Sequence, residues 1–249
     1  MGTPSSMTRT GKHEPWELQV SRGQIAFHKR LLKFGYNALI NDTEETIWEG
    51  GGIYSYPSSG LAMTVTSASG ATDNGVKITI EGLDADYNEQ SVEVTLAGSG
   101  TATTTETFLR VFRAFVSGST APIGAITIAN GGTTYAYING DNQTLMALWT
   151  VPAGYTAYLV QTDVTVMTEA NNKFGKMRII TREPGGVFRT QDNFSASNID
   201  IVRSYTYPLP IPEKTDIEFR AIASSSNALL QVSATFEIIY IENIIPPTN

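Results

Sequence analysis

The chain has 249 residues, no cysteine, two histidines and a formal net charge of −7. The lack of cysteine excludes disulfides, thiolate zinc sites and cysteine nucleophiles, and two histidines leave little material for general-base catalysis near neutral pH. The acidic charge disfavours nucleic-acid binding, and no apolar stretch approaches the ~20 residues of a membrane-spanning helix, so we expect neither a nucleic-acid nor a membrane partner.

The N-terminal segment, residues 1–35, is predicted to be an extended arm. Its first fifteen residues are polar and contain no apolar run of the kind that a signal peptide needs. Residues 24–33 are the one locally positive stretch of the chain, and we predict a short helix or an irregular strand there. The basic side chains concerned are His28, Lys29, Arg30 and Lys33. We predict that they dock on an acidic neighbouring protein, with a solvated face as the alternative of equal weight.

A first β unit is predicted over residues 36–118. Residues 76–80 and 92–96 each alternate apolar and polar side chains, which is the pattern of a half-buried strand. The segment between these two runs is polar and rich in turn-forming residues, so the three together predict a β-hairpin.

The turn of this hairpin is acidic. Asp84, Asp86 and Asn88 stand at every second position, like the start of a calcium-binding loop. Such a loop needs Gly at its sixth position and Glu at its twelfth, but Glu89 and Thr95 stand there. We therefore predict no EF-hand site and no metal, with a weaker calcium site of another kind as the alternative. The residues Asp84, Asp86, Asn88 and Glu89 are predicted to form a surface bend that presents acceptor oxygens to a neighbouring subunit or to solvent.

A strand with apolar residues on both faces is predicted at residues 108–116, so it is expected to be covered on both sides. Arg110 and Arg113 lie on its opposite faces, and each is predicted to need a carboxylate or carbonyl partner. The small polar residues 117–122 then mark a boundary to a second β unit, residues 119–249. Roughly eight regularly spaced strands in this unit predict a sandwich or jelly roll, and the fold class is therefore all-β.

The sequence carries no catalytic signature that we recognise. It has no nucleophile elbow, no H-E-x-x-H motif, no P-loop and no dinucleotide fingerprint. We therefore predict that the chain is not an enzyme and that it has no catalytic residues and no cofactor. Four aromatic residues are instead predicted to anchor a partner: Trp48, Tyr54, Tyr56 and Tyr87. Alternatively, the three tyrosines line a groove for a sugar.

Four short blocks, in this order, resemble a known family. They are KFGYN (33–37), ETIWEGGGIY (45–54), EGLDADYNE (81–89) and FLRV (108–111). Together they are similar to virion structural proteins of tailed bacteriophages, especially short-tailed phages of marine and freshwater bacteria. The resemblance is strongest over residues 20–116, with a weaker similarity at VPAG (151–154). It implies a particle component without chemistry of its own.

Three functions follow as hypotheses. The first is a decoration or cement protein on a phage head, assembled in the host cytoplasm as a homo-oligomer, with a trimer favoured, and contacting the major capsid protein or another virion protein. The second is a tail, neck or baseplate component, which the same residues would serve equally well. The third is a glycan-binding module for host recognition, which needs an exposed aromatic groove.

Overall fold

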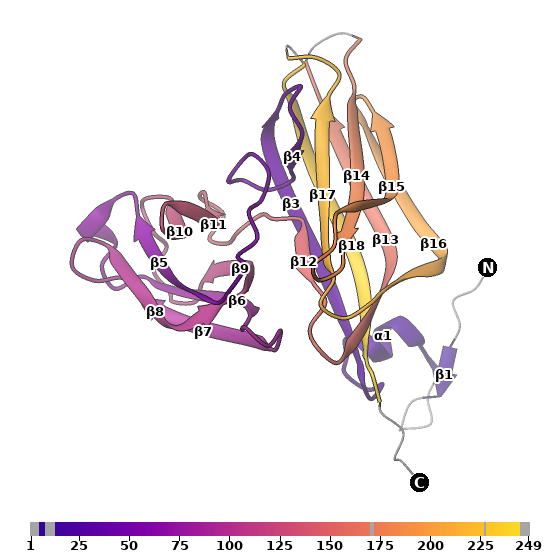
Figure 1. The fold of residues 1–249 in the computed structure, drawn as a ribbon, viewed down its shortest axis with the longest axis horizontal. Helices are drawn as coiled ribbons and strands as arrows, with labels where there is room; N and C mark the ends of the chain where they lie inside the picture. The colour runs from indigo at the N-terminus through magenta and orange to yellow at the C-terminus, as the bar shows by residue number, and fades with distance from the viewer. Residues whose placement is uncertain (1–4, 8–12, 170–171, 227, 245–249) are drawn as a thin grey trace.

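The computed structural model describes residues 5–7, 13–169, 172–226 and 228–244, and these form two β-rich lobes (Figure 1). The predicted all-β fold class is confirmed, because the only helices in the described residues are α1 (Trp16–Ser21) and the short 3-10 helix η1 (Gly70–Asp73). The larger lobe is a β-sandwich, and the smaller lobe is inserted into it between two of its strands.

The sandwich consists of two antiparallel sheets. One has the strand order β16-β13-β18-β3, formed by β3 (His28–Ile40), β13 (Tyr155–Met167), β16 (Ile199–Ile211) and β18 (Leu230–Glu242). The other has the order β12-β17-β14-β15, with β4 also paired to β17; its strands are β4 (Glu45–Thr46), β12 (Leu148–Thr150), β14 (Gly175–Arg182), β15 (Arg189–Ala196) and β17 (Asp216–Ala223). The apolar positions that alternate along these strands meet between the sheets, where Trp149, Phe219 and Phe236 are fully buried.

The small lobe also has two sheets around its own core. The strand order β11-β10-β5-β8 is formed by β5 (Leu61–Ser67), β8 (Thr101–Phe108), β10 (Ile126–Asn130) and β11 (Thr133–Ile138). The order β7-β6-β9 is formed by β6 (Lys77–Leu83), β7 (Glu89–Thr95) and β9 (Arg110–Val116). The predicted hairpin is confirmed as β6 and β7, which pair antiparallel with Ile80 opposite Val92.

Residues 28–35 of the predicted arm lie within the sandwich. They begin β3, whose register with β18 runs from His28 opposite Ile241 to Ile40 opposite Leu230. The reason is that β3 has a buried face, on which Gly35 and Ile40 lie. Before β3, the two-stranded pair of β1 (Ser5–Met7) and β2 (His13–Pro15) leads into α1, which contacts β3.

The division of the chain differs from the predicted boundaries at residues 35/36 and 118/119. The core of the small lobe collects residues from Trp48 to Leu148, so this lobe lies between β4 and β12 as an insertion. The second boundary falls inside the lobe, because β10, beyond it, pairs with β5, before it. The sandwich in turn takes its strands from both ends of the chain.

Two connecting segments join the lobes and run side by side. The Ile47 N–H donates to the carbonyl of Phe219 (3.0 Å), and the Ala147 N–H donates to the carbonyl of Ile47 (2.9 Å). Trp48 and Met146 then form an antiparallel bridge one residue further along. This pair of segments passes so close to β3 that only a glycine fits at position 35.

Candidate functional site

The junction between the lobes contains a buried ion pair. Arg110, on β9 of the small lobe, donates from Nε to Oδ1 of Asp216 on β17 at 2.7 Å, and both side chains are less than a tenth exposed. Asp216 also accepts hydrogen bonds from Arg182 (Nη2, 2.6 Å) and from the hydroxyl of Thr150 (2.7 Å). The predicted need of Arg110 for a carboxylate partner is thus confirmed, and its partner belongs to the other lobe.

A second carboxylate, Glu218, lies fully buried two residues along β17. The Tyr56 hydroxyl of the small lobe donates to it at 3.0 Å, and Arg220 pairs with it. Burial raises the pKa of the Glu218 carboxyl, and the Arg220 guanidinium opposes that shift. Arg220 and Arg178 both reach Glu44, so the network extends along this face of the sandwich.

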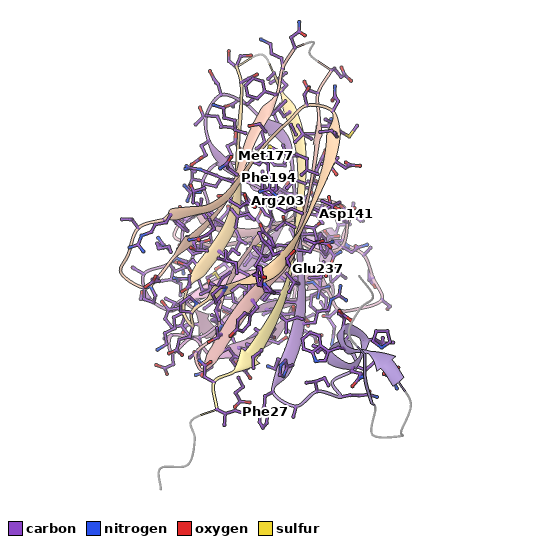
Figure 2. All side chains as sticks on the ribbon, turned by 90° about the vertical axis from the view of Figure 1, so that its right-hand side faces the viewer. Phe27, Asp141, Met177, Phe194, Arg203 and Glu237 are labelled. Carbon is purple, nitrogen blue, oxygen red and sulfur yellow. The ribbon has the colours of Figure 1, made fainter. Side chains whose placement is uncertain are left out.

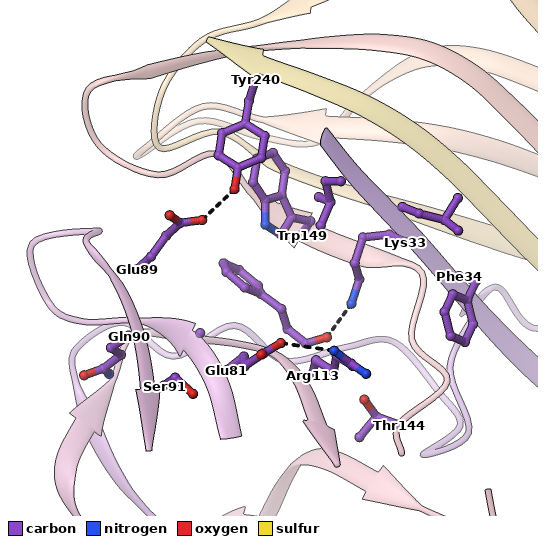
Figure 3. Close-up of a pocket in the computed structure, with 14 residues that line it drawn as sticks. Lys33, Phe34, Glu81, Glu89, Gln90, Ser91, Arg113, Thr144, Trp149 and Tyr240 are labelled. Carbon is purple, nitrogen blue, oxygen red and sulfur yellow. Dashed lines mark hydrogen bonds and ion pairs between the residues drawn. The ribbon is translucent and has the colours of Figure 1, made fainter. Parts of the chain in front are cut away.

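Three side chains connect the two lobes at one end of the junction and form what we call the clasp: Lys29, Glu89 and Tyr240. Lys29 on β3 forms an ion pair with Glu89 of the small lobe at 2.7 Å. The Tyr240 hydroxyl donates to the other oxygen of Glu89 at 2.9 Å (Figure 3). The Lys29 ammonium also lies over the rings of Tyr155 and Tyr240. The clasp therefore closes one side of the seam, which is the interface between β3, β12 and β18 of the sandwich and β6, β7 and β9 of the small lobe.

Lys33 lies in the interior of this seam and is 7% exposed. Its ammonium donates to the backbone carbonyl of Phe112 on β9 (Figure 3). Desolvation, with a contribution from the positive charge of Arg113 and against the attraction of Glu81, lowers the pKa of Lys33 to about 7. Lys33 is thus a buried amine that joins the lobes through a neutral acceptor.

The shifted pKa of Lys33 predicts that the protein becomes more stable as the pH rises above neutrality. Between about pH 7 and the ordinary lysine pKa of 10.5, the unfolded chain holds a proton that the folded chain has lost, so raising the pH favours the folded state. We expect the free energy of unfolding to increase by ~2 kcal/mol between about pH 7.5 and pH 9.5. Urea denaturation at each pH measures it.

The matched variants for this prediction are Lys33→Met and Lys176→Met. Methionine keeps the volume of Lys33 and removes the titrating group. The free energy of unfolding of Lys33→Met is therefore expected to stay constant over the same pH range. Lys176 is exposed on β14, and its replacement is expected to leave the wild-type rise in place. A wild-type profile without a rise, or a rise retained by Lys33→Met, contradicts the assignment.

The acidic turn between β6 and β7 is organised by Asp84. Its Oδ1 accepts hydrogen bonds from the backbone N–H groups of Asp86 and Asn88, both at 2.9 Å, and its Oδ2 accepts one from the Asn88 side chain. Although desolvation opposes the shift, these bonds lower the pKa of Asp84. Its carboxylate is thus used within the turn, and Tyr87 takes a positive φ of 67° beside it.

The structure brings several of the predicted partner-binding residues together at the junction, and it leaves others apart. Lys29, Lys33, Tyr56 and Tyr87 lie there: the Tyr87 carbonyl accepts a hydrogen bond from the Ala153 N–H at 3.0 Å. Arg30 pairs with Glu237 on the sandwich surface at 3.0 Å, and the His28 ring packs against Trp16. Asp86 and Asn88 are exposed.

Trp48 and Tyr54 are corrected as partner contacts, because the structure buries both in the small lobe. They are 4% and 2% exposed, and their rings pack edge to face with centroids 5.3 Å apart. Tyr54 packs in turn against Tyr56, whose face is covered by the guanidinium groups of Arg110 and Arg182. These aromatic residues stabilise the lobe and its junction, and a partner cannot reach the two buried ones.

Sequence reasoning did not single out Asp216, Glu218 or Tyr240, which complete the junction together with Glu89 of the acidic turn. The sequence does contain a pattern that indicates the two carboxylates on β17. Asp216 and Glu218 alternate with Ile217 and Phe219, so the two acidic side chains lie on the face of the strand opposite to the core of the sandwich. That this face is covered by the inserted lobe follows only from the tertiary structure.

The outer strand β16 carries three exposed apolar or aromatic side chains. Ile199, Val202 and Tyr207 are 56%, 59% and 89% exposed. Its pairing with β13 shifts register between Leu209 and Ser204, so residues 205–208 bulge from the sheet. Figure 1 shows β16 on the side of the sandwich away from the small lobe. On the inner side of β16, the guanidinium carbon of Arg203 lies 4.6 Å from the centroid of the Phe194 ring (Figure 2).

The charge is distributed unevenly between the lobes. Residues 48–146 contain nine Asp and Glu against three Lys and Arg, a net −6 of the −7 of the whole chain. The sandwich is therefore close to neutral. Among the described residues, no three His, Asp or Glu side chains are grouped as metal ligands, and no helix has the length and hydropathy to span a bilayer.

Comparison with known proteins gives a weak structural similarity and no sequence match. No protein-family model and no curated protein sequence matches the chain. Similar solved structures include the VP2 subviral particle of infectious bursal disease virus, with 11% identity and a TM-score of 0.25, covering 88% of this chain and 73% of that one. The Gx strain of that virus gives 10% identity and a TM-score of 0.27 over 88% and 74%. The chain thus has a weak structural similarity to a viral particle protein, and TM-scores of this size leave its function to be argued from its own residues.

Proposed function

We propose that this chain is a non-enzymatic structural protein of a tailed-bacteriophage particle, and specifically a decoration or cement protein that binds the head as a homo-oligomer. The observation that carries the proposal is the outer strand β16, which is 13 residues long and on which Val202 and Tyr207 are 59% and 89% exposed. An outer strand presents unpaired backbone groups as well as side chains, so it is a surface on which another subunit can add.

The distribution of charge between the lobes also supports β16 as the contact surface between copies. Two small lobes with a net charge of −6 each repel one another, and like charges in contact cost several kcal/mol. The contact between copies is therefore expected on the near-neutral sandwich, on the β16 side that faces away from the small lobe (Figure 1). A trimer around this side keeps the acidic lobes apart.

The blocks that resemble phage virion proteins also converge in space. KFGYN lies on β3, ETIWEGGGIY runs through the connection between the lobes, EGLDADYNE forms the end of β6 and its turn, and FLRV joins β8 to β9. All four contribute to the junction through Lys33, Ile47, Glu89 and Arg110. The resemblance therefore concerns the residues that fix the two lobes to each other, as a particle subunit of defined shape requires.

Self-association through β16 predicts the behaviour of two single variants. Replacing Val202 with glutamate places a charge in the centre of the proposed contact, and we expect the dissociation constant of the oligomer to rise at least about tenfold. Light scattering should give the wild type a mass of three times the 27.0 kDa chain and give Val202→Glu the mass of one chain at the same concentration.

Val187→Glu is the control, because Val187 is 72% exposed but lies between β14 and β15. It is expected to assemble like the wild type. A wild type that stays monomeric at every concentration contradicts self-association, and a Val202→Glu variant that assembles normally contradicts the assignment to β16.

Particle binding tests the decoration role itself. The purified chain should cosediment with heads of its phage from which it has been removed, and Val202→Glu should do so less well if the oligomer is the binding unit. A decoration protein occupies many symmetric positions on the head, whereas a tail, neck or baseplate component forms one closed ring. Copy number per particle therefore separates the first hypothesis from the second.

The glycan-binding hypothesis has less support. A sugar groove needs exposed aromatic faces, but Tyr54 is buried and Tyr56 lies under two arginines. We therefore expect no signal from a glycan array. A specific glycan signal, or turnover of a polysaccharide, would favour the third hypothesis over the first.

A further inference from the structure

A cavity of about 550 Å³ lies in the seam between the lobes (Figure 3). Its walls come from β3, β12 and β18 of the sandwich and from β6, β7 and β9 of the small lobe. Leu31, Phe112, Trp149 and Tyr240 supply apolar surface. A cavity of this size, mostly apolar and with a few convergent polar groups, is typical of sites for small molecules.

Lys33 extends into this cavity without an anionic partner. Its amine is held by the carbonyl of Phe112, and no ion pair joins it to a carboxylate within the described residues. A buried ammonium that lacks a counter-ion is strongly disfavoured. Desolvation accordingly lowers the pKa of Lys33 to about 7.

Each of the other charged side chains that face the cavity already has a partner of opposite charge within the chain. Glu89, on β7, is held by Lys29 and by the Tyr240 hydroxyl. Glu81, on β6, lies 3.6 Å from the guanidinium of Arg113 on β9. With Lys33 protonated, the cavity therefore has one positive charge that the chain does not balance.

We propose that this cavity binds a small organic monoanion, with its aromatic or aliphatic body against Trp149, Phe112 and Tyr240 and its acidic group at the amine of Lys33. The anion supplies the counter-ion that the chain lacks there, and its body fills apolar space between the lobes. Lys33 takes up one proton from solvent as the anion binds, so binding strengthens as the pH falls toward neutrality. The site is independent of the proposed contact at β16.

Titration calorimetry of the full chain at pH 8 with 2-naphthoate and its neutral analogue 2-naphthamide tests the site. We expect one naphthoate per chain, bound at least about tenfold more tightly than the amide, which is the effect of a charged hydrogen bond. Repeating the titration in two buffers of different ionisation enthalpy should reveal proton uptake on naphthoate binding and none on amide binding.

Variants and spectra locate the binding. Lys33→Met should weaken naphthoate about tenfold and abolish its proton uptake while leaving the amide unchanged, and Lys176→Met should behave as the wild type. In the wild type, which needs no altered chain to fold, naphthoate should shift the indole N–H resonance of Trp149 and leave that of Trp16 in place.

Three results would overturn the proposal. One is equal affinity of Lys33→Met and wild type for naphthoate. Another is binding that leaves the Trp149 resonance unmoved. The third is the absence of saturable binding by both 2-naphthoate and decanoate, which together sample an aromatic and an aliphatic body.

Discussion

Replacing Asp216 with asparagine is expected to lower the free energy of unfolding by about 3–5 kcal/mol. The carboxylate of Asp216 is the only anion paired with Arg110 among the described residues, and it also holds Arg182. The Arg110 side chain is 8% exposed. Asparagine keeps the shape but leaves a buried guanidinium beside a neutral amide, so the desolvation of the charge is no longer compensated.

The loss is expected at the junction first, because Arg110 and Asp216 belong to different lobes. Hydrogen exchange should therefore accelerate in β9 and β17, and urea denaturation gives the total loss. Asp86→Asn is the matched control: Asp86 is exposed in the β6–β7 turn, and its change is expected to stay within about 0.5 kcal/mol. If both variants unfold like the wild type, the ion pair does not stabilise the junction.

Replacing Gly35 with alanine is expected to destabilise the protein by about 3 kcal/mol, the upper end of overpacking effects, or to prevent folding. A Cβ at this position would lie 2.2 Å from the backbone N of Ala147 and 2.4 Å from the carbonyl oxygen of Ile47. Those atoms belong to the two segments that connect the lobes, and their backbone hydrogen bonds prevent them from moving aside.

Gly118→Ala is the control for this substitution. A Cβ there would meet Lys77 at 3.5 Å, an ordinary contact, and the position is exposed. We expect its stability to match the wild type within about 0.5 kcal/mol. Circular dichroism melts compare the two variants, and a Gly35→Ala protein that melts with the wild type would show that β3 does not approach the connection this closely.

Local patterns in the sequence predicted the strands well because alternation reports burial directly. The β6–β7 hairpin follows from Ile78, Ile80, Val92 and Val94, and the need of Arg110 for a carboxylate follows from its place in an apolar strand. Turn chemistry likewise explains how Asp84 organises the bend, because its carboxylate accepts the backbone N–H groups of Asp86 and Asn88.

These local patterns could not predict that the small lobe is inserted between two strands of the sandwich. The pairing of β5 with β10 spans some sixty residues, and β3 pairs with β18 from the opposite end of the chain. Both depend on which apolar faces meet after collapse, which neighbouring residues do not encode. The small polar stretch at 117–122 resembles a domain boundary in composition, yet it joins strands of one lobe.

The candidate site was partly predicted for the same reason. The positive charges around Lys29 and Lys33 are visible in the sequence, and so are the carboxylates of the acidic turn. That Lys29 meets Glu89 within one chain, and that Lys33 is buried without an anion, depends on the approach of the two lobes. Charge in a sequence identifies candidates for contact, but it does not distinguish an internal partner from an external one.

A reconstruction of the phage particle by electron cryomicroscopy, with the chain labelled, measures the proposed function most directly. We predict density for the two-lobed subunit repeated over the head, with the β16 sides of neighbouring copies together and the acidic lobes apart. A particle that lacks the chain altogether would contradict the virion role, and density confined to a tail or neck ring would contradict decoration of the head.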